Sequence, residues 1–228
     1  MSRRSNSAQR CDSCRLPRPL CVCSRLPRIA ARTALVLVVH REEERKTTNT
    51  GLLAARCLPH ARVVVVGDRA RPPPAPLLAQ HERAVLLFPD ACALPLAHYA
   101  DGAPLTLVVP DGSWRQASKI ARRAPGLDAL PRVALPAGTP SAYRLRSEPR
   151  AGGLATLEAI AAALAVLEGE AMVAPLLDAF RCFVDRTLWL RGALADHEVY
   201  GGVPEGAHEA GVRGRVHPRS TQCATPGA

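Results

Sequence analysis

The stretch that decides the fold joins an apolar run to a helical pattern and reads Val108-Val109-Pro110-Asp111-Gly112-Ser113-Trp114-Arg115-Gln116-Ala117-Ser118-Lys119. The apolar run is rich in β-branched residues and stops at Pro110, which predicts a buried strand. Ser113, followed three residues later by Gln116, is a capping box and predicts a helix that begins at Ser113. Asp111 should then lie beside the free N–H groups of the first helical turn, at the strand end where open α/β sheets bind ligands. A plain strand–turn–helix joint, with Asp111 as turn former and Trp114 in the core, fits the same pattern.

Strands and helices alternate along the chain on both sides of this stretch. Apolar runs of strand length lie at residues 33–40, 62–66, 84–88, 105–109 and 132–135. Helical patterns lie at about residues 51–58, 113–123, 154–167 and 170–190. The alternation predicts an α/β fold with a mostly parallel sheet. The polar connection at residues 136–153 is long for a compact domain, and such loops are usually functional or disordered.

The length of 228 residues allows one domain with a full core and short additions at its ends. We expect a basic arm with a metal knuckle at residues 1–32, a catalytic domain at 33–191 and a Gly-rich flexible tail at 192–228. No apolar run approaches the roughly 20 residues that span a membrane, and the first residues lack the apolar segment of a signal peptide. The sequence therefore predicts a cytoplasmic protein without a membrane segment.

Four cysteines crowd the N-terminal part in the pattern Cys11-x-x-Cys14-x6-Cys21-x-Cys23. Their spacing suits four thiolates around one tetrahedral ion, and Zn²⁺ is the ion that such sites hold most often. A disulfide across a single intervening residue would be strained, although a redox pair stays an alternative. The sequence predicts a zinc knuckle with these four cysteines as ligands.

The net charge of +10 indicates a polyanionic partner. Its distribution says more than its size, because an arginine-rich chain with only two lysines also fits a GC-rich genome. Residues 1–32 hold eight arginines against one acid, and a helical stripe of cations follows Trp114. The residues that we predict to contact RNA phosphates are Arg18, Arg25, Arg28, Arg115, Lys119 and Arg122. A disordered arm and a solvated helix face are the alternatives.

Further motifs follow one another in a set order. They are Thr48-Asn49-Thr50-Gly51, Asp111-Gly112-Ser113-Trp114, Pro140-Ser141-Ala142-Tyr143-Arg144-Leu145-Arg146 and Thr156-Leu157-Glu158-Ala159. With the cysteine head, they make the chain resemble the DTW-domain family, the tRNA-uridine aminocarboxypropyltransferases. The resemblance covers residues 11 to about 160 and implies a SPOUT-like knotted domain. It also implies transfer of the 3-amino-3-carboxypropyl group of S-adenosylmethionine to N3 of a tRNA uridine, with release of methylthioadenosine.

The chain departs from the family pattern at two positions. Ser113 stands where the family usually has threonine, and serine caps a helix equally well. Ala155 stands where the family tends to have serine. This second change should remove a capping box with Glu158, at a cost of about 1 kcal/mol.

The resemblance and the chemistry of the reaction together assign roles to the motif residues. We expect Asp111 and Trp114 to be catalytic, with Asp111 either accepting the N3 proton as a general base or only positioning the donor. The residues that we expect to bind S-adenosylmethionine are Pro110, Gly112, Ser113, Ser141, Tyr143, Leu145 and Arg146. Arginines of the long loop, Arg144 and Arg146, or the N–H groups after Ser113 could hold the donor carboxylate. Tyr143 should stack on adenine or a base, whereas Trp114 suits the core and stacking equally.

Other polar residues have simpler interpretations. His40 should be structural, residues 42–44 should form a solvated acidic run, and Glu158 should be a dipole partner in the first turn of its helix. Two other functions stay open: an RNA methyltransferase of SPOUT type that uses the same cofactor, and a non-catalytic zinc-knuckle protein that binds RNA. The target uridine, the tRNAs and the oligomeric state do not follow from the sequence.

Overall fold

The computed structural model describes residues 10–68, 70, 72–73, 77–78, 83–136, 138, 141–145 and 153–208. Of the predicted site residues, Arg146 lies outside the described residues. The first nine residues of the predicted basic arm and residues 209–228 of the predicted tail lie outside them as well.

A six-stranded parallel sheet forms the centre of the described chain and confirms the predicted fold class. Its strands are β1 (Ala34–His40), β2 (Arg62–Val66), β3 (Ala84–Leu87), β4 (Leu94–Pro95), β5 (Thr106–Asp111) and β6 (Arg132–Ala134). They pair in the order β2-β1-β5-β3-β6-β4, and every pairing is parallel. Sequence reasoning missed β4, because a strand of two residues is too short to show any periodicity.

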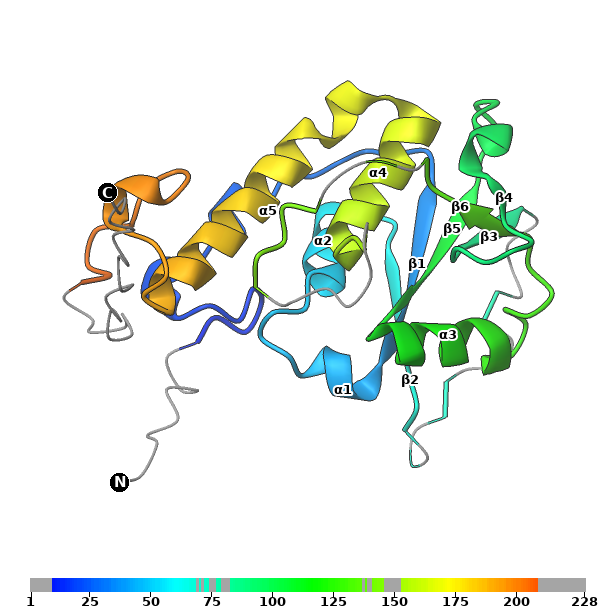
Figure 1. Cartoon of the computed structure of the whole chain (residues 1–228), viewed down its shortest axis with the longest axis horizontal. Helices are drawn as coiled ribbons and strands as arrows, with labels where there is room; N and C mark the ends of the chain where they lie inside the picture. The colour runs from blue at the N-terminus through cyan, green and yellow to red at the C-terminus, as the bar shows by residue number, and fades with distance from the viewer. Residues whose placement is uncertain are drawn as a thin grey trace, which may run out of the picture.

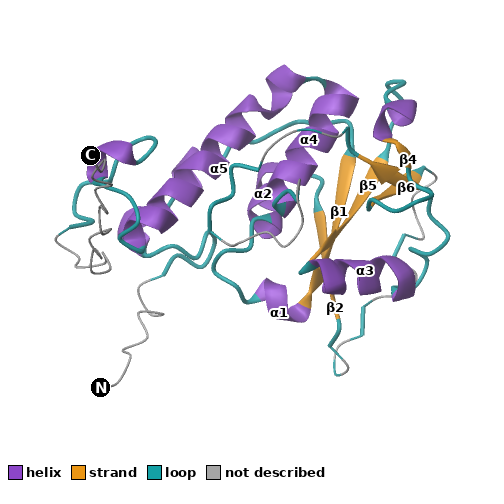
Figure 2. Cartoon of the chain, in the orientation of Figure 1, coloured by secondary structure: helices purple, strands orange, loops and turns teal. Residues whose placement is uncertain are grey.

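Helices cover both faces of the sheet. They are α1 (Arg41–Glu44), α2 (Gly51–Cys57), α3 (Trp114–Arg123), α4 (Thr156–Glu168) and α5 (Glu170–Leu190). Figure 1 shows α2, α4 and α5 on one face and α3 on the other, and Figure 2 shows the same layers by element type. No helix in the described part of the chain is long and apolar enough to cross a bilayer.

The two-sided cover explains why the first strand is apolar at every position. Alternate residues of a strand face opposite sides of the sheet. In β1, Leu35 and Leu37 therefore join the core that includes α4 and α5, whereas Val36 and Val38 join the core that includes α3. Burial on both faces is typical of parallel sheets inside α/β proteins, and it leaves only the ends of the strands for ligands.

The central strand β5 ends two residues later than predicted and includes Pro110. Thr106 N donates to the Arg83 carbonyl at 2.9 Å, so the even-numbered N–H groups of β5 point toward β3. The β3 pairing ends at Val108, while the β1 pairing continues to Asp111. Pro110, which has no N–H to donate, therefore costs the ladder no hydrogen bond. As a result, Asp111 stands at the end of the sheet rather than in a free turn.

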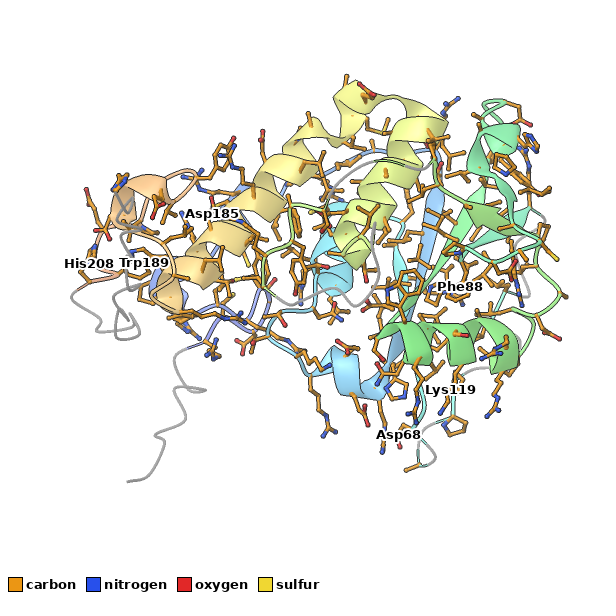
Figure 3. The ribbon with its side chains drawn as sticks, in the orientation of Figure 1. Asp68, Phe88, Lys119, Asp185, Trp189 and His208 are labelled. Carbon is orange, nitrogen blue, oxygen red and sulfur yellow. The ribbon has the colours of Figure 1, made fainter. Side chains whose placement is uncertain are left out.

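Both ends of the described chain pack on the domain. Leu16, Leu20 and Val22 of the cysteine head are buried in the same core as α4 and α5, so the head is not a separate arm. Residues 192–208 also differ from the predicted flexible tail, because they fold back along α5. Trp189 Nε1 donates to Asp196 Oδ1 at 2.9 Å, and Figure 3 shows His208 beside Trp189, with the two rings edge to face at 5.2 Å. These few contacts lie between polar and aromatic side chains without periodicity, which is why sequence patterns did not reveal them.

Candidate active site and cysteine cluster

A cavity of about 1680 Å³ opens at the carboxyl ends of β3, β5 and β6 and extends between α4 and α5. Seven of the nine predicted catalytic and cofactor-binding residues line it. These seven are Pro110, Asp111, Gly112, Ser113, Trp114, Ser141 and Tyr143. The structure thus brings motifs that are separated by many residues in the sequence to one edge of the sheet.

Asp111 joins three of these motifs through its carboxylate. Its side chain is buried, at 4% exposure. Asn49 Nδ2 donates to Oδ2 at 2.5 Å, and Thr156 Oγ1 donates to Oδ1 at 2.5 Å. Asn49 is itself fixed, because its Oδ1 accepts from Leu52 N at 2.8 Å. Gly51 completes the packing, since a Cβ there would lie 3.0 Å from both the Asp111 carboxyl carbon and Thr156.

The turn after Asp111 has the predicted capping box. Ser113 N donates to Gln116 Oε1 at 2.8 Å, and Gln116 N donates to Ser113 Oγ at 3.4 Å. A Cβ on Gly112 would lie 2.8 Å from Gln116 Cβ, so only glycine fits before the cap. Trp114 is partly exposed on the cavity wall, and its ring packs edge-on against Phe88 at 6.2 Å between centroids. Trp114 therefore has one side in the core and another toward the cavity.

Glu158 anchors the loop that carries Ser141 and Tyr143. Its carboxylate accepts from Ser141 Oγ at 2.6 Å and from Ala142 N at 2.6 Å. It also accepts from Ala155 N at 2.8 Å, which is the backbone half of a capping box. The predicted loss at Ala155 therefore applies only to the half that needs a side-chain oxygen. The role of Glu158 as a dipole partner alone was too narrow a prediction.

Tyr143, Arg144 and Leu145 are fixed by contacts with other residues of the domain. The Tyr143 hydroxyl donates to the Thr48 carbonyl at 2.9 Å, and its ring stacks on Phe180 with centroids 6.1 Å apart. Leu145 is buried away from the cavity lining, and its carbonyl accepts from Arg191 at 2.9 Å. Arg144 pairs with Asp185 of α5, labelled in Figure 3. The structure therefore gives Leu145 and Arg144 contacts that shape the loop.

The sequence predicted that the acidic run at residues 42–44 is solvated, but the structure buries one of its three side chains. Glu43 of α1 is buried, lines the cavity and pairs with Lys46. Glu42 is exposed, as predicted, and Glu44 is partly buried. His40 has the structural role that we expected, since its Nδ1 accepts from Glu42 N at 3.3 Å and caps α1. A helix of four residues leaves no periodicity in the sequence, so the burial of Glu43 was not predictable from it.

The four cysteines of the head converge on one point. The sulfur atoms of Cys11, Cys14, Cys21 and Cys23 all lie within 4.8 Å of one another. The Cys11–Cys23 and Cys14–Cys21 sulfur pairs are 3.6 Å and 3.7 Å apart. Four sulfurs at about 2.3 Å from a tetrahedral zinc ion would be separated by about 3.8 Å. The geometry of the cluster therefore fits a metal ion of that size.

The environment of the cluster favours thiolate at one ligand. Burial raises the pKa of Cys11, but hydrogen bonds from the backbone at Cys14 and Ser13 and from the other thiols outweigh this effect. Together they lower the pKa to about 6. Burial raises the pKa of Cys14 and that of Cys21. Cys23 N also donates to Cys21 Sγ at 3.4 Å, as expected for a backbone that wraps a thiolate. A bound cation would favour the ionised form of all four thiols.

An arginine of α5 that sequence reasoning missed lies against this cluster. Arg186 is buried, at 4% exposure, and its Nη1 donates to the Cys21 carbonyl at 2.8 Å and to the Leu20 carbonyl at 3.3 Å. Its Nε is buried and has no hydrogen-bond partner among the described residues. Burial lowers the pKa of Arg186, the direction expected for a desolvated cation. Its isolated position in an apolar helix pattern was the only signal in the sequence.

The cations that we predict to contact RNA are exposed in two separate regions. Arg115, Lys119 and Arg122 lie along α3, and Figure 3 shows Lys119 on the outer side of that helix. Arg18, Arg25 and Arg28 lie in the head, away from α3 in Figure 1. Arg25 also donates to the Gly201 carbonyl at 3.0 Å, so it helps to hold the C-terminal segment.

Comparisons with known proteins agree with the arrangement of these motifs. The chain is 33% identical over 171 residues to tRNA-uridine aminocarboxypropyltransferase 2 of Drosophila melanogaster, covering 72% of this chain and 68% of that protein. It is 31% identical over 167 residues to the Macaca fascicularis protein of the same name, covering 69% of this chain but only 56% of that protein. The solved SAM-dependent rRNA:acp-transferase Tsr3 from Vulcanisaeta distributa is a looser match, with a TM-score of 0.42 and 18% identity over 68% of this chain and 77% of that one. The model of the DTW domain matches residues 8–188, and the chain therefore belongs to the DTW domain family.

Proposed function

We propose that this chain is a tRNA-uridine aminocarboxypropyltransferase that uses S-adenosylmethionine as its donor. The observation that carries the proposal is the convergence of three family motifs on the buried Asp111 carboxylate, inside one cavity. The relatives in fly and macaque carry the name of this activity. The cavity exceeds the 300–1,000 Å³ typical of small-molecule sites, so it leaves room for a nucleotide beside the donor.

The reaction joins N3 of uridine to the methionine Cγ carbon of the donor. The N3–Cγ bond forms as the Cγ–S bond breaks, and the sulfur leaves with the electron pair as neutral methylthioadenosine. The N3 proton passes to a base or to solvent. The enzyme must present Cγ, and not the methyl carbon, to the nucleophile, so its main contribution is to orient the donor.

The residues of the cavity can supply that orientation. The N–H groups of the first turn of α3 point to the strand end and suit the donor carboxylate, because a helix N-terminus favours anions. Ser141 and Tyr143 lie on a loop that Glu158 fixes, so they offer a preformed wall for the nucleoside part of the donor. Trp114 closes the other side.

Asp111 suits a positioning role better than that of a general base. Each of its oxygens already accepts a hydrogen bond from a neutral donor, Asn49 or Thr156, and such bonds stabilise the ionised carboxylate. A general base must also reach the proton that it removes, and Asp111 is buried. We therefore infer that Asp111 holds the Thr48–Gly51 motif and the start of α4 in the geometry that binds the donor.

The four-cysteine cluster is proposed as a structural zinc site. The sulfur distances fit tetrahedral coordination, and the reacting carbon needs no metal. A bound ion would link the segment with Cys11 and Cys14 to the segment with Cys21 and Cys23. The buried Leu20 and Val22 would then fix this knuckle to the core.

We also propose that the cations of α3 and of the head hold the phosphates of tRNA. Removal of Arg115, Lys119 and Arg122 should flatten the log–log dependence of tRNA affinity on salt by about 0.7–0.9 for each lost contact. The variant should bind S-adenosylmethionine with unchanged affinity, because none of the three lines the cavity. A salt slope equal to that of the wild type would instead make this helix face a solvated surface.

Two further parts of the proposal rest mainly on the family resemblance. One is the SPOUT-like knot. It is supported by Tyr143, which follows β6 and contacts both Thr48, earlier in the chain, and Phe180, later in the chain. The other is a cytoplasmic location, which suits a tRNA substrate.

The test is a reaction of the full-length protein with tRNA and S-adenosylmethionine, followed by mass analysis of the nucleosides. The proposal predicts an aminocarboxypropyl adduct on uridine and one methylthioadenosine for each adduct. A methyl adduct with S-adenosylhomocysteine would favour the SPOUT-type methyltransferase. Failure to bind S-adenosylmethionine in calorimetry, with tRNA binding intact, would favour the non-catalytic RNA-binding protein.

A further inference from the structure

Arg186 is a buried cation that the rest of the described protein does not neutralise. It forms no ion pair with a carboxylate among the described residues, and the neighbouring acid, Asp185, is engaged by Arg144 and by Tyr200 N. Its recorded hydrogen bonds go only to neutral carbonyl groups of the cysteine head. Because an unpaired charge in a protein interior is costly, an anion is expected close to it.

The cysteine cluster can supply that anion, and its negative charge is largest when a metal ion holds all four sulfurs as thiolates. Four neutral thiols carry no charge, and neither do two disulfides. Four thiolates around one Zn²⁺ carry a net charge of −2. Arg186 donates to the carbonyl of Cys21, one of these four residues, so the charge of a loaded cluster would develop within reach of the guanidinium.

We propose that Arg186 is the internal counter-ion of the metal–thiolate cluster, so that α5 and the cysteine head stabilise each other more strongly when the metal is bound. Residues outside the first coordination shell tune metal affinity in this way, typically by 10- to 100-fold. The inference rests on the proposed metal site but not on the transferase reaction. It makes Arg186 a positioning residue of the metal site, 163 residues or more beyond the cysteines that it serves.

The test compares substitutions that separate charge from hydrogen bonding. Arg186→Met removes both, Arg186→Gln keeps a donor without charge, and Arg186→Lys keeps the charge. We expect Zn²⁺ affinity, measured by competition with a chelator, to fall at least tenfold in the Met and Gln variants and to stay within a few fold of the wild type in the Lys variant. Co²⁺ bound in place of Zn²⁺ should report, through its thiolate absorption, whether all four sulfurs still coordinate.

A second measurement removes the effect of lost hydrogen bonds. Thermal unfolding with saturating Zn²⁺ and with excess chelator should show a larger loss of Tm for Arg186→Met in the loaded protein, because the lost carbonyl contacts weaken both states equally. Arg191→Met is the matched control, since Arg191 also donates to a backbone carbonyl, that of Leu145, but is exposed. Its Tm loss should be the same in both states.

The outcomes discriminate clearly. Equal Zn²⁺ affinity in the wild type and Arg186→Met, with equal Tm losses in both states, would make Arg186 only a hydrogen-bond donor to the head. A wild-type protein that binds no Zn²⁺ or Co²⁺ at all would overturn both this inference and the metal site. If Arg186→Met does not fold, the contrast between the Gln and Lys variants decides the same question.

Discussion

Asp111 and Arg186 are equally buried, at 4% exposure each, but the protein treats their charges differently. The Asp111 carboxylate accepts hydrogen bonds from Asn49 and Thr156. Asn49 is fixed by its bond from Leu52 N, and Thr156 by its place at the start of α4. The Arg186 guanidinium donates to two neutral carbonyls, and its Nε has no partner in the part of the chain that the structure describes. The Asp111 oxygens are thus satisfied by groups of the chain itself, whereas the proposed counter-ion of Arg186 is the metal-loaded cysteine cluster.

Because of this difference, we expect the stability of the two regions to depend differently on metal. Substitutions around Asp111 should cost the same with or without metal, because the hydrogen-bond donors described there are groups of the chain itself. The effect of substitutions in the cysteine head should depend strongly on metal, because a bound ion would cross-link the head and favour the ionised form of its thiols. Every prediction below therefore gains from being measured twice, once with Zn²⁺ and once with chelator.

The largest effect should come from Asp111→Asn. One oxygen becomes an amide group that points a donor at Asn49 or Thr156, so the two motifs lose their common anchor. We expect aminocarboxypropyl transfer to fall about 1000-fold, equivalent to about 4 kcal/mol. Single-turnover rates with excess enzyme measure the loss, and circular dichroism should still show a folded α/β protein.

Thr156→Val tests whether Asp111 acts through its hydrogen bonds. This variant keeps the carboxylate and removes one donor, at a cost of about 1–3 kcal/mol in stability. If Asp111 positions the donor, transfer should fall mainly through weaker S-adenosylmethionine binding. A normal KM together with a shifted pH profile of kcat would instead identify Asp111 as a general base.

The next effect concerns the cysteine head. Cys14→Ser removes the most buried of the four sulfur ligands and should abolish stoichiometric Zn²⁺ binding. At free metal 100-fold above Kd, the lost stabilisation is about 2.7 kcal/mol, or roughly 5–11 °C in Tm. Elemental analysis and thermal scans measure both quantities. The Tm difference between variant and wild type should shrink in chelator, and a difference that persists unchanged would mean that Cys14 acts only by packing.

Glu158→Gln should have a smaller effect, confined to the active-site region. The carboxylate accepts three hydrogen bonds, and the amide of Gln cannot accept at both ends. We expect a stability loss of about 1–3 kcal/mol and a raised KM for S-adenosylmethionine, because the Ser141 loop loses its anchor. The stability loss should be the same with Zn²⁺ and with chelator, and a loss that depends on metal would contradict the separation of the two regions.

The parts that the sequence predicted share one physical property, which is local periodicity. The strand at 105–109, the capping box at Ser113 and the four-cysteine spacing each depend on residues within one turn or one strand. The structure confirms these elements, and β5 extends further only because Pro110 faces the side where β3 has ended. Of the nine residues that motif order assigns to catalysis or donor binding, seven line the cavity, and their roles stay predictions.

The parts that the sequence did not predict depend on contacts between distant segments. These contacts join segments that show no periodic pattern in the sequence. They are the burial of Glu43, the three hydrogen bonds of Glu158, the packing of residues 192–208 on α5 and the contact of Arg186 with Cys21. An arginine in an apolar helix looks the same in a sequence whether it faces solvent or a thiolate cluster. The two charged groups that distinguish the two regions thus differ in predictability, since Asp111 sits in a local motif and Arg186 does not.

The smallest effect should come from the cap that follows Asp111. Ser113→Ala removes the oxygen that accepts from Gln116 N and should cost about 1 kcal/mol, whereas Ser113→Thr, which restores the usual residue of the family, should be nearly neutral. Ser118→Ala, in the middle of the same helix, is the control and should change stability little. Ser113 caps α3 only two residues beyond Asp111. The Ala variant should therefore also weaken S-adenosylmethionine binding, because it disturbs the first N–H groups of the helix. Chemical denaturation with Zn²⁺ and with chelator should give the same loss. A loss that appears only with Zn²⁺ would mean that the two regions are coupled through the core and are not separate.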